Sequence, residues 1–130
     1  MEKPSIPEGY QQVMPYLILQ NAEDFFDFMQ KVFGATERYK AMRDETRIAH
    51  AELQVGESTI MYASSTDQWK TQTAGMFIYV ANADETYARA LAEGALSVME
   101  MSDQSYGRTG GVADPFGNVW WITTPLPHAL

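Results

Sequence analysis

The same pattern of segments occurs twice in this chain, about sixty residues apart. The run Leu17–Asp24 leads through an apolar helical segment to Gly34-Ala35, and the run Phe77–Asp84 leads through another to Gly94-Ala95. Strand-like runs follow in both halves, and a short glycine-containing turn closes each half. A repeat of this length is too long for a solenoid unit. The chain is therefore predicted to fold as two β-α-β-β-β modules that enclose a space between their sheets.

The spacing of apolar residues and turn residues places the strands and helices of each half. In the first half, Asn21 is the expected N-cap of a helix that ends at Gly34, and Asp84 and Gly94 take these places in the second half. The expected strands are 12–19, 36–43, 47–55 and 58–63, then 76–80, 95–101, 108–113 and 119–124, with a loop at 102–107. This mixture indicates an α+β fold. We expect a single domain over residues 1–130, with module one at about 10–64, a linker at about 65–75 and module two at about 76–124.

The composition restricts the class of protein. With 130 residues and an apolar fraction of 45%, the chain is long enough to bury a core as one domain. It contains no cysteine, which excludes disulfides, thiol nucleophiles and thiolate metal ligands. The net charge of −8 disfavours binding to nucleic acid. It favours a cationic ligand or partner, unless the charge serves solubility alone. No apolar run has the length of a signal-peptide core or a membrane span, so a cytoplasmic protein without membrane contact is expected.

Several stretches of the chain resemble one protein family. They are Ile48–Gly56, Gly110–Trp121, Pro7–Tyr10 and Pro15–Ile18, and together they resemble the vicinal oxygen chelate (VOC) superfamily, more narrowly its glyoxalase/bleomycin-resistance and PhnB-like branch. The resemblance implies that each module forms half of a cupped, barrel-like mixed sheet around a cavity, and that the protein is a homodimer. Enzymatic members of the family carry a metal on His and Glu side chains that face the cavity. Antibiotic-sequestering members bind their ligand without a metal.

In the family that the chain resembles, the metal ligands lie near the start of the first strand and within the last strand of each module. The corresponding residues here are Met14, Ile60 or its neighbour Met61, Gly75 and Trp121. None of them carries an imidazole or a carboxylate, which a divalent cation needs as a ligand. At these positions the resemblance therefore predicts no metal site and no cofactor.

Strand alternation predicts which side chains face the cavity. On the third strand, small apolar residues suit the helix side, which leaves Ile48, His50, Glu52 and Gln54 for the cavity. His50 and Glu52 point the same way and are the one ionisable pair expected there. They are the candidate catalytic residues, as an acid/base or ligand-orienting pair. The alternative is a structural hydrogen bond within the sheet.

The remaining candidates for ligand binding are mostly aromatic, because aromatic faces hold planar or cationic molecules. Such rings can equally belong to the core or to a dimer interface. Arg108 could hold an anionic group or pair with surface carboxylates, and His128 is expected to be solvated. The complete set of predicted ligand-binding residues is Tyr16, His50, Glu52, Tyr62, Trp69, Phe77, Tyr79, Tyr106, Arg108 and Trp121.

Three functions remain open from the sequence. The first is metal-independent binding of a small organic molecule, cationic or aromatic, which includes sequestration of an antibiotic. The second is an enzyme of the VOC type, lyase or dioxygenase-like, that uses His50 and Glu52. The third is an interaction module that binds no ligand. Whether the protein is an enzyme is not decided by its sequence.

Overall fold

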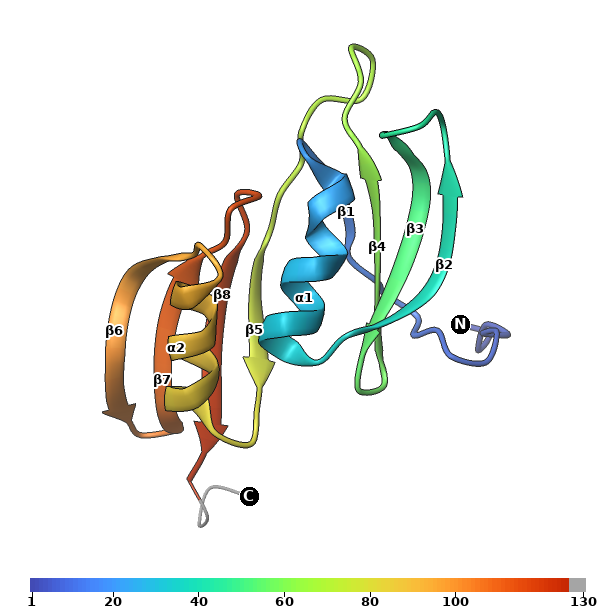
Figure 1. Cartoon of the computed structure of the whole chain (residues 1–130). Coiled ribbons are helices and arrows are strands. Elements are labelled where there is room, and N and C mark those ends of the chain that lie inside the picture. Colours follow the sequence, from blue (N-terminus) through green and yellow to red (C-terminus); the bar gives the residue numbers. More distant parts are fainter. Residues whose placement is uncertain (127–130) are drawn as a thin grey trace. The chain divides into compact units, whose positions relative to one another are not determined.

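The structure is a computed structural model that describes residues 1–126 (Figure 1). His128 lies outside the described residues. The chain divides into two compact units, the first made of residues 1–30 and 34–72, and the second of residues 31–33 and those from 73 on. Each unit contains one four-stranded sheet. No helix among the described residues is long and apolar enough to cross a membrane.

In the first unit, the sheet has the strand order β1-β4-β3-β2. The 3-10 helix η1 and helix α1 follow β1, and α1 lies over one face of this sheet (Figure 1). β1 runs parallel to β4, whereas β3 is antiparallel to both β4 and β2. The elements are β1 (Tyr16–Leu19), η1 (Ala22–Asp24), α1 (Phe25–Phe33), β2 (Thr36–Met42), β3 (Ile48–Val55) and β4 (Ser58–Ser64).

The second unit repeats this arrangement, with the strand order β5-β8-β7-β6. β5 runs parallel to β8, and β7 is antiparallel to both β8 and β6. Helix α2 covers one face of the sheet (Figure 1). The elements are β5 (Gly75–Tyr79), α2 (Ala83–Ala92), β6 (Leu96–Gln104), β7 (Gly107–Ala113) and β8 (Val119–Pro125). The predicted α+β fold of two βαβββ modules is confirmed, because both halves share one strand order and one set of strand directions.

The helix ends agree only in part with the sequence prediction. Gly34 ends α1 as expected, with a φ of 71° that favours glycine. Asn21 holds the N-cap position of η1, but it lies in the left-handed region and its side chain makes no capping hydrogen bond; the residue before α1 is Asp24. In α2 the cap is Asn82 rather than Asp84, since the Asn82 side chain accepts a hydrogen bond from the Glu85 N–H at 3.1 Å.

Two strand boundaries differ from the prediction by more than one residue. β1 begins at Tyr16 rather than at residue 12, and the residue before it, Pro15, has no N–H to give to a sheet ladder. The predicted loop at 102–107 is mostly strand. β6 continues to Gln104, and a tight turn leads into β7 at Gly107.

The helix side of the first sheet is closed by buried side chains, among them Leu17 and Leu19. Tyr62 belongs to this core: it is 1% exposed, and its ring centroid lies 5.0 Å from that of Phe25 on α1. The prediction that Tyr62 faces the cavity is wrong. β4 pairs with β3 so that Tyr62 lies opposite Ala51, and opposite residues of an antiparallel pair share a face.

We call the face of each sheet that its helix does not cover the open face. In the first unit, His50 and Glu52 share this face, as their hydrogen bond shows. Ile48 departs from the predicted alternation, because it is buried while its neighbour Ala49 is exposed. The pairing of β2 with β3 shifts its register here, because Ala41 pairs with His50 whereas Met42 pairs with Ile48. Ala49 is thereby left without a partner in this pairing, which interrupts the alternation.

In the second unit, two adjacent glycines identify the two faces. A Cβ at Gly110 would meet the ring of Tyr87 on α2, so Gly110 faces the helix. A Cβ at Gly111 would lie 2.5 Å from the Trp121 ring, so Trp121 lies on the open face. Phe77 is the register partner of Trp121 in the parallel β5–β8 pair and therefore shares that face.

A buried aspartate organises the turn between β7 and β8. Asp114 Oδ1 accepts hydrogen bonds from the N–H groups of Phe116 and Asn118, both at 2.9 Å. Its Oδ2 accepts from Asn118 Nδ2 at 3.0 Å and from Trp120 Nε1 at 2.8 Å. The Asp-Pro-Phe-Gly-Asn stretch thus has a structural role: it forms the turn and holds Trp120, which is 2% exposed, in the core.

Candidate functional site

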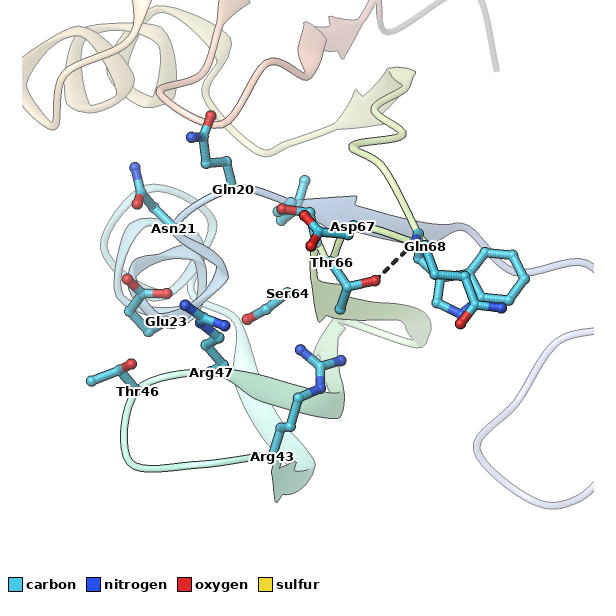
Figure 2. Close-up of a pocket in the computed structure, with 13 residues that line it drawn as sticks. Gln20, Asn21, Glu23, Arg43, Thr46, Arg47, Ser64, Thr66, Asp67 and Gln68 are labelled. Atoms are coloured by element: carbon cyan, nitrogen blue, oxygen red, sulfur yellow. Dashed lines mark hydrogen bonds between the residues drawn. The ribbon is translucent and has the colours of Figure 1, made fainter.

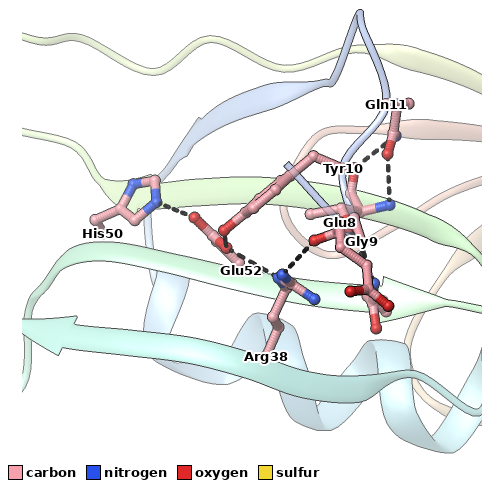
Figure 3. A network of polar contacts seen from close by, with 9 residues as sticks. Glu8, Gly9, Tyr10, Gln11, Arg38, His50 and Glu52 are labelled. Atoms are coloured by element: carbon pink, nitrogen blue, oxygen red, sulfur yellow. Dashed lines mark hydrogen bonds and ion pairs between the residues drawn. The ribbon is translucent and has the colours of Figure 1, made fainter. Parts of the chain in front are cut away.

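The carboxylate of Glu52 is the centre of a polar network on the open face of the first sheet (Figure 3). Glu52 is 6% exposed. Its Oε1 accepts a hydrogen bond from Tyr10 Oη at 2.6 Å and pairs with Arg38 Nε at 3.6 Å. Its Oε2 lies 2.8 Å from His50 Nε2. Because an ionised carboxylate can only accept, the His50 Nε2 carries the hydrogen of this bond.

The surroundings of Glu52 hold it in the ionised form. Burial alone would raise the pKa of this carboxyl, since a buried charge is poorly solvated. The hydrogen bonds from Tyr10 and His50, together with the charge of Arg38, outweigh burial and lower the pKa below its usual value. Both carboxylate oxygens are therefore already occupied by donors of this chain.

The imidazole of His50 links Glu52 to a more exposed tyrosine. His50 Nδ1 lies 2.9 Å from Tyr16 Oη, and the two ring centroids are 5.4 Å apart. In the tautomer whose hydrogen is on Nε2, Nδ1 accepts the Tyr16 hydroxyl hydrogen. The result is a phenol–imidazole–carboxylate chain whose phenol end is 47% exposed. Such a chain can orient a ligand or pass a proton between the ligand and the imidazole.

The N-terminal segment covers part of this open face (Figure 3). The carbonyl of Gly9 accepts hydrogen bonds from Thr59 Oγ1 at 2.6 Å and from Gln54 Nε2 at 3.2 Å. Arg38 donates to the carbonyl of Glu8 at 3.0 Å, and its guanidinium lies 4.4 Å from the centroid of the Tyr10 ring. These contacts fix Tyr10 above Glu52.

A pocket of about 470 Å³ opens beside this network, lined by Tyr10, Arg38, Tyr39 and Glu52. Sequence reasoning missed the roles of Tyr10 and Arg38. Alternation could have placed Arg38 on one face of β2, but nothing in the pattern links residue 10 to residue 52. The contact depends on the path of an N-terminal segment that has no regular secondary structure.

The open face of the second sheet is aromatic rather than polar. Phe77, Tyr79 and Tyr106 are 49%, 63% and 45% exposed. The Phe77 ring centroid lies 5.2 Å from that of Tyr79 and 6.1 Å from that of Tyr106. Trp121 is the neighbour of Phe77 on the same face. We call these four residues the aromatic patch. They are four of the predicted ligand-binding residues, brought together on one surface.

The structure separates the other predicted residues from both groups. Trp69 is 57% exposed in the segment after β4 and lines a different pocket of the first unit. Arg108 pairs with carboxylates, at 3.1 Å to Asp84 and 3.4 Å to Asp103. Its guanidinium accordingly lowers the pKa of the Asp84 carboxyl. Of the two roles considered for Arg108, the described contacts show the ion pair.

The donor groups of the first sheet do not fit the metal site of the family that the sequence resembles. Among residues 1–126, no three His, Cys, Asp or Glu side chains gather closely enough to hold an ion. His50 and Glu52 are bonded to each other, and the second oxygen of Glu52 is taken by Tyr10 and Arg38. We therefore derive no chemical step through a metal.

Comparisons with known proteins agree with this fold. A sequence model of the Glyoxalase/Bleomycin resistance protein/Dioxygenase superfamily matches residues 10–122. An uncharacterized protein of Mycobacterium bovis is 31% identical over 124 residues, which cover 86% of this chain and 82% of the relative. The crystal structure of TioX from Micromonospora sp. ML1 has a TM-score of 0.74 at 23% identity and covers 89% of this chain and 99% of TioX. The PhnB protein from Bacillus cereus has a TM-score of 0.69 at 16% identity, with 88% and 99% of the two chains covered. These two structures show a shared fold, and the family match extends over most of the sequence. The chain belongs to the Glyoxalase/Bleomycin resistance protein/Dioxygenase superfamily.

Proposed function

We propose that this protein binds a small organic molecule with aromatic character, without a metal, through the aromatic patch of its second unit. The observation that carries the proposal is a group of three half-exposed rings on a face that α2 leaves uncovered, in which Phe77 contacts both Tyr79 and Tyr106. Exposed aromatic rings that gather on one surface are typical of binding sites. The family description names bleomycin resistance proteins beside two classes of enzyme, so a binding function lies within the range of the family.

The chemistry of the patch indicates the class of ligand. Ring pairs contribute about 0.5–1.5 kcal/mol each beyond the area they bury, so three rings supply about 1.5–4.5 kcal/mol. Micromolar affinity requires about 8 kcal/mol, and the rest must come from buried apolar area and charge. The net charge of −8 favours a cationic ligand, and tyrosine and tryptophan faces attract cations as well. A planar aromatic cation, such as a cationic antibiotic that the protein sequesters, meets both conditions.

The finer assignments belong to the same proposal. We place the chain in the PhnB-like branch, which the likeness to the Bacillus cereus PhnB protein supports. We also expect a cytoplasmic homodimer. The exposed apolar side chains of Leu96 and Val98 on β6 favour association, because burying them against a second copy removes them from water. Sedimentation analysis of the purified protein measures the oligomeric state directly.

Calorimetric titration tests the proposed binding, with bleomycin and a series of planar cationic antibiotics as probes. Binding should weaken in Tyr79→Ala and Phe77→Ala. Tyr39→Ala is the comparison variant, because it removes a tyrosine of 52% exposure that lines the pocket beside Glu52, the alternative site in the first unit. A ligand whose affinity falls equally in all three variants does not use the aromatic patch. Absence of heat with every probe would leave the ligand-free interaction module as the better explanation.

A second candidate function is supported by the chain of hydrogen bonds from Tyr16 through His50 to Glu52. We propose it as an acid/base site, in which Glu52 orients the imidazole and Tyr16 meets the substrate. Enzymatic turnover that survives exhaustive chelation and is lost in His50→Gln would favour this function over simple binding. A divalent ion that copurifies in stoichiometric amount and is lost in His50→Gln would refute the metal-free assignment.

A further inference from the structure

A second pocket of the first unit shares no lining residue with the pocket beside Glu52. Its volume is about 850 Å³. Three segments form it: the turn after β1, the turn between β2 and β3, and the chain that follows β4 (Figure 2). Arg43 and Arg47 come from the second of these segments, and Ser64, Thr66 and Trp69 come from the third.

The two arginines of this pocket differ from the other arginines of the chain. Arg38, Arg89 and Arg108 each form an ion pair with a carboxylate. No ion pair joins Arg43 or Arg47 to a carboxylate of residues 1–126, although Glu23 and Asp67 also line the pocket. Besides hydrogen bonds from backbone N–H groups, the charges of Arg47 and Arg43 help to lower the pKa of Asp44. What distinguishes the site is therefore two guanidinium groups without ion-pair partners among the described residues, and not a net positive charge.

The turn that carries the arginines is held in place by its own hydrogen bonds. Asp44 Oδ1 accepts from the N–H of Thr46 at 3.0 Å and from the N–H of Arg47 at 2.7 Å. The N–H of Arg43 donates to the carbonyl of Arg47 at 2.8 Å. The bonds from Thr46 and Arg47 also lower the pKa of the Asp44 carboxyl. The two guanidinium groups therefore extend from a fixed backbone, which reduces the entropy lost when they bind a common partner.

The third segment contributes two hydroxyl groups to the pocket. Ser64 Oγ accepts a hydrogen bond from the N–H of Ile48, and Thr66 Oγ1 accepts one from the N–H of Trp69, both at 2.8 Å. Each hydroxyl thus serves as an acceptor and keeps its own hydrogen for another acceptor. Trp69 is 57% exposed. The pocket wall therefore combines two cations, two hydroxyl donors and a free indole face.

We infer that this pocket is a binding site for an organic anion with a flat ring, whose carboxylate or phosphate group is held by Arg43 and Arg47 and whose ring stacks on Trp69. Guanidinium groups bind both kinds of anion through paired hydrogen bonds. The indole face accounts for the ring, because aromatic faces stack on planar groups. This site is separate from the aromatic patch and has the opposite charge preference. Its existence does not depend on the proposed function.

The probes are phenyl phosphate, benzoate and inorganic phosphate. Their binding is measured by calorimetry and by the shifts of the indole N–H resonances in NMR spectra. Saturable binding of phenyl phosphate or benzoate should weaken about tenfold or more in Arg43→Gln and in Arg47→Gln, as the loss of a charge-assisted contact predicts. Lys40→Gln is the matched control, because it removes one positive charge from β2 outside the pocket. Trp69→Ala should abolish the preference for phenyl phosphate over inorganic phosphate. All four side chains are exposed or half-exposed, so these variants should keep the fold.

Three results would overturn the inference. One is the absence of saturable binding with all three probes. Another is a loss of affinity in Lys40→Gln as large as in the arginine variants, which would show only a general effect of charge. The third is inorganic phosphate binding as tightly as phenyl phosphate in the unchanged protein, which would remove the ring from the site. Tyr79→Ala must leave the binding of these anions unchanged, so that this test stays independent of the aromatic patch.

Discussion

Replacing Asp114 by asparagine should destabilise the second unit more than any other removal of a single negative charge from it. The carboxylate accepts four hydrogen bonds, two on each oxygen, and the residue is 6% exposed. An asparagine side chain keeps one oxygen and gains an NH₂ group. In either orientation of the amide, two of the four donors then face another donor instead of an acceptor.

The size of the effect follows from those two donors. A buried donor without an acceptor costs about 1–3 kcal/mol, so the expected loss in the free energy of unfolding is about 4 kcal/mol. For a chain of this length, that loss corresponds to a fall in the melting temperature of roughly 12 °C. Urea denaturation followed by tryptophan fluorescence suits the test, because Trp120 is itself one of the donors.

Asp84→Asn is the control for this prediction. It removes the same charge from an exposed residue that pairs with Arg108, and exposed ion pairs contribute at most about 1 kcal/mol. A loss below about 1 kcal/mol in Asp114→Asn, or an equal loss in the control, would refute the reasoning. A double-mutant cycle with Trp120→Phe provides a further check: where the asparagine NH₂ group takes the place of Oδ2, Trp120 Nε1 is one of the mismatched donors, and Asp114→Asn should then cost less in the Trp120→Phe background than in the unchanged protein.

Three further predictions concern single side chains. Glu52→Gln should reduce the loss of stability on acidification, which acid denaturation curves measure. The lowered pKa of Glu52 contributes stability that is present above about pH 4.5 and is lost as the pH falls through the lower pKa of the folded state. Burial, with a smaller contribution from Glu37, raises the pKa of Tyr62 from 10.0 to about 12. Stability should therefore fall as the pH rises from about 10 to about 12, because the unfolded chain loses this proton first, and the fall should be absent in Tyr62→Phe. Gly111→Ala should displace the Trp121 ring and cost about 1–3 kcal/mol, seen as a lower denaturation midpoint and a shifted Trp121 indole resonance.

The duplication predicted the fold because it specifies topology. Each copy has the same order of one strand, one helix and three strands, so each is expected to bury its sheet under its helix in the same arrangement. The two sheets do have equivalent strand orders, β1-β4-β3-β2 and β5-β8-β7-β6. The alternation within β4 was predicted incorrectly, although the sequence contains the information needed to correct it. Gly56 and Glu57 form a two-residue turn between Val55 and Ser58, which are register partners. Counting outward from that turn places Met61, not Tyr62, opposite Glu52.

The contacts of the candidate sites were less predictable than the fold. Tyr10 reaches Glu52 from 42 positions away through a segment without regular structure, and periodicity carries no information about such a segment. The break in alternation at Ile48 comes from a register shift against β2, which depends on the partner strand. For residues on regular strands, such as Phe77 and Tyr79, the alternation of side chains along the strand was enough to predict that they share one face of the sheet.

The registers show how the two open faces diverged from one pattern. Tyr16 pairs with Met61, and Met61 pairs with Glu52 on the neighbouring strand. In the second unit, Phe77 pairs with Trp121, and Trp121 pairs with Gly111. The position that holds a buried carboxylate in one module is thus a glycine in the other.

This difference has a direct physical consequence. A side chain at position 111 would collide with the Trp121 ring, so the indole can occupy this place beside β7 only because residue 111 is a glycine. In the first module the equivalent position holds Glu52, whose charge must be matched by Tyr10, His50 and Arg38. One duplicated framework therefore gives an ion-paired polar face and an aromatic face. The proposed acid/base and stacking functions are assigned to different modules for this reason, and variants of Glu52 should leave ligand stacking on the aromatic patch unchanged.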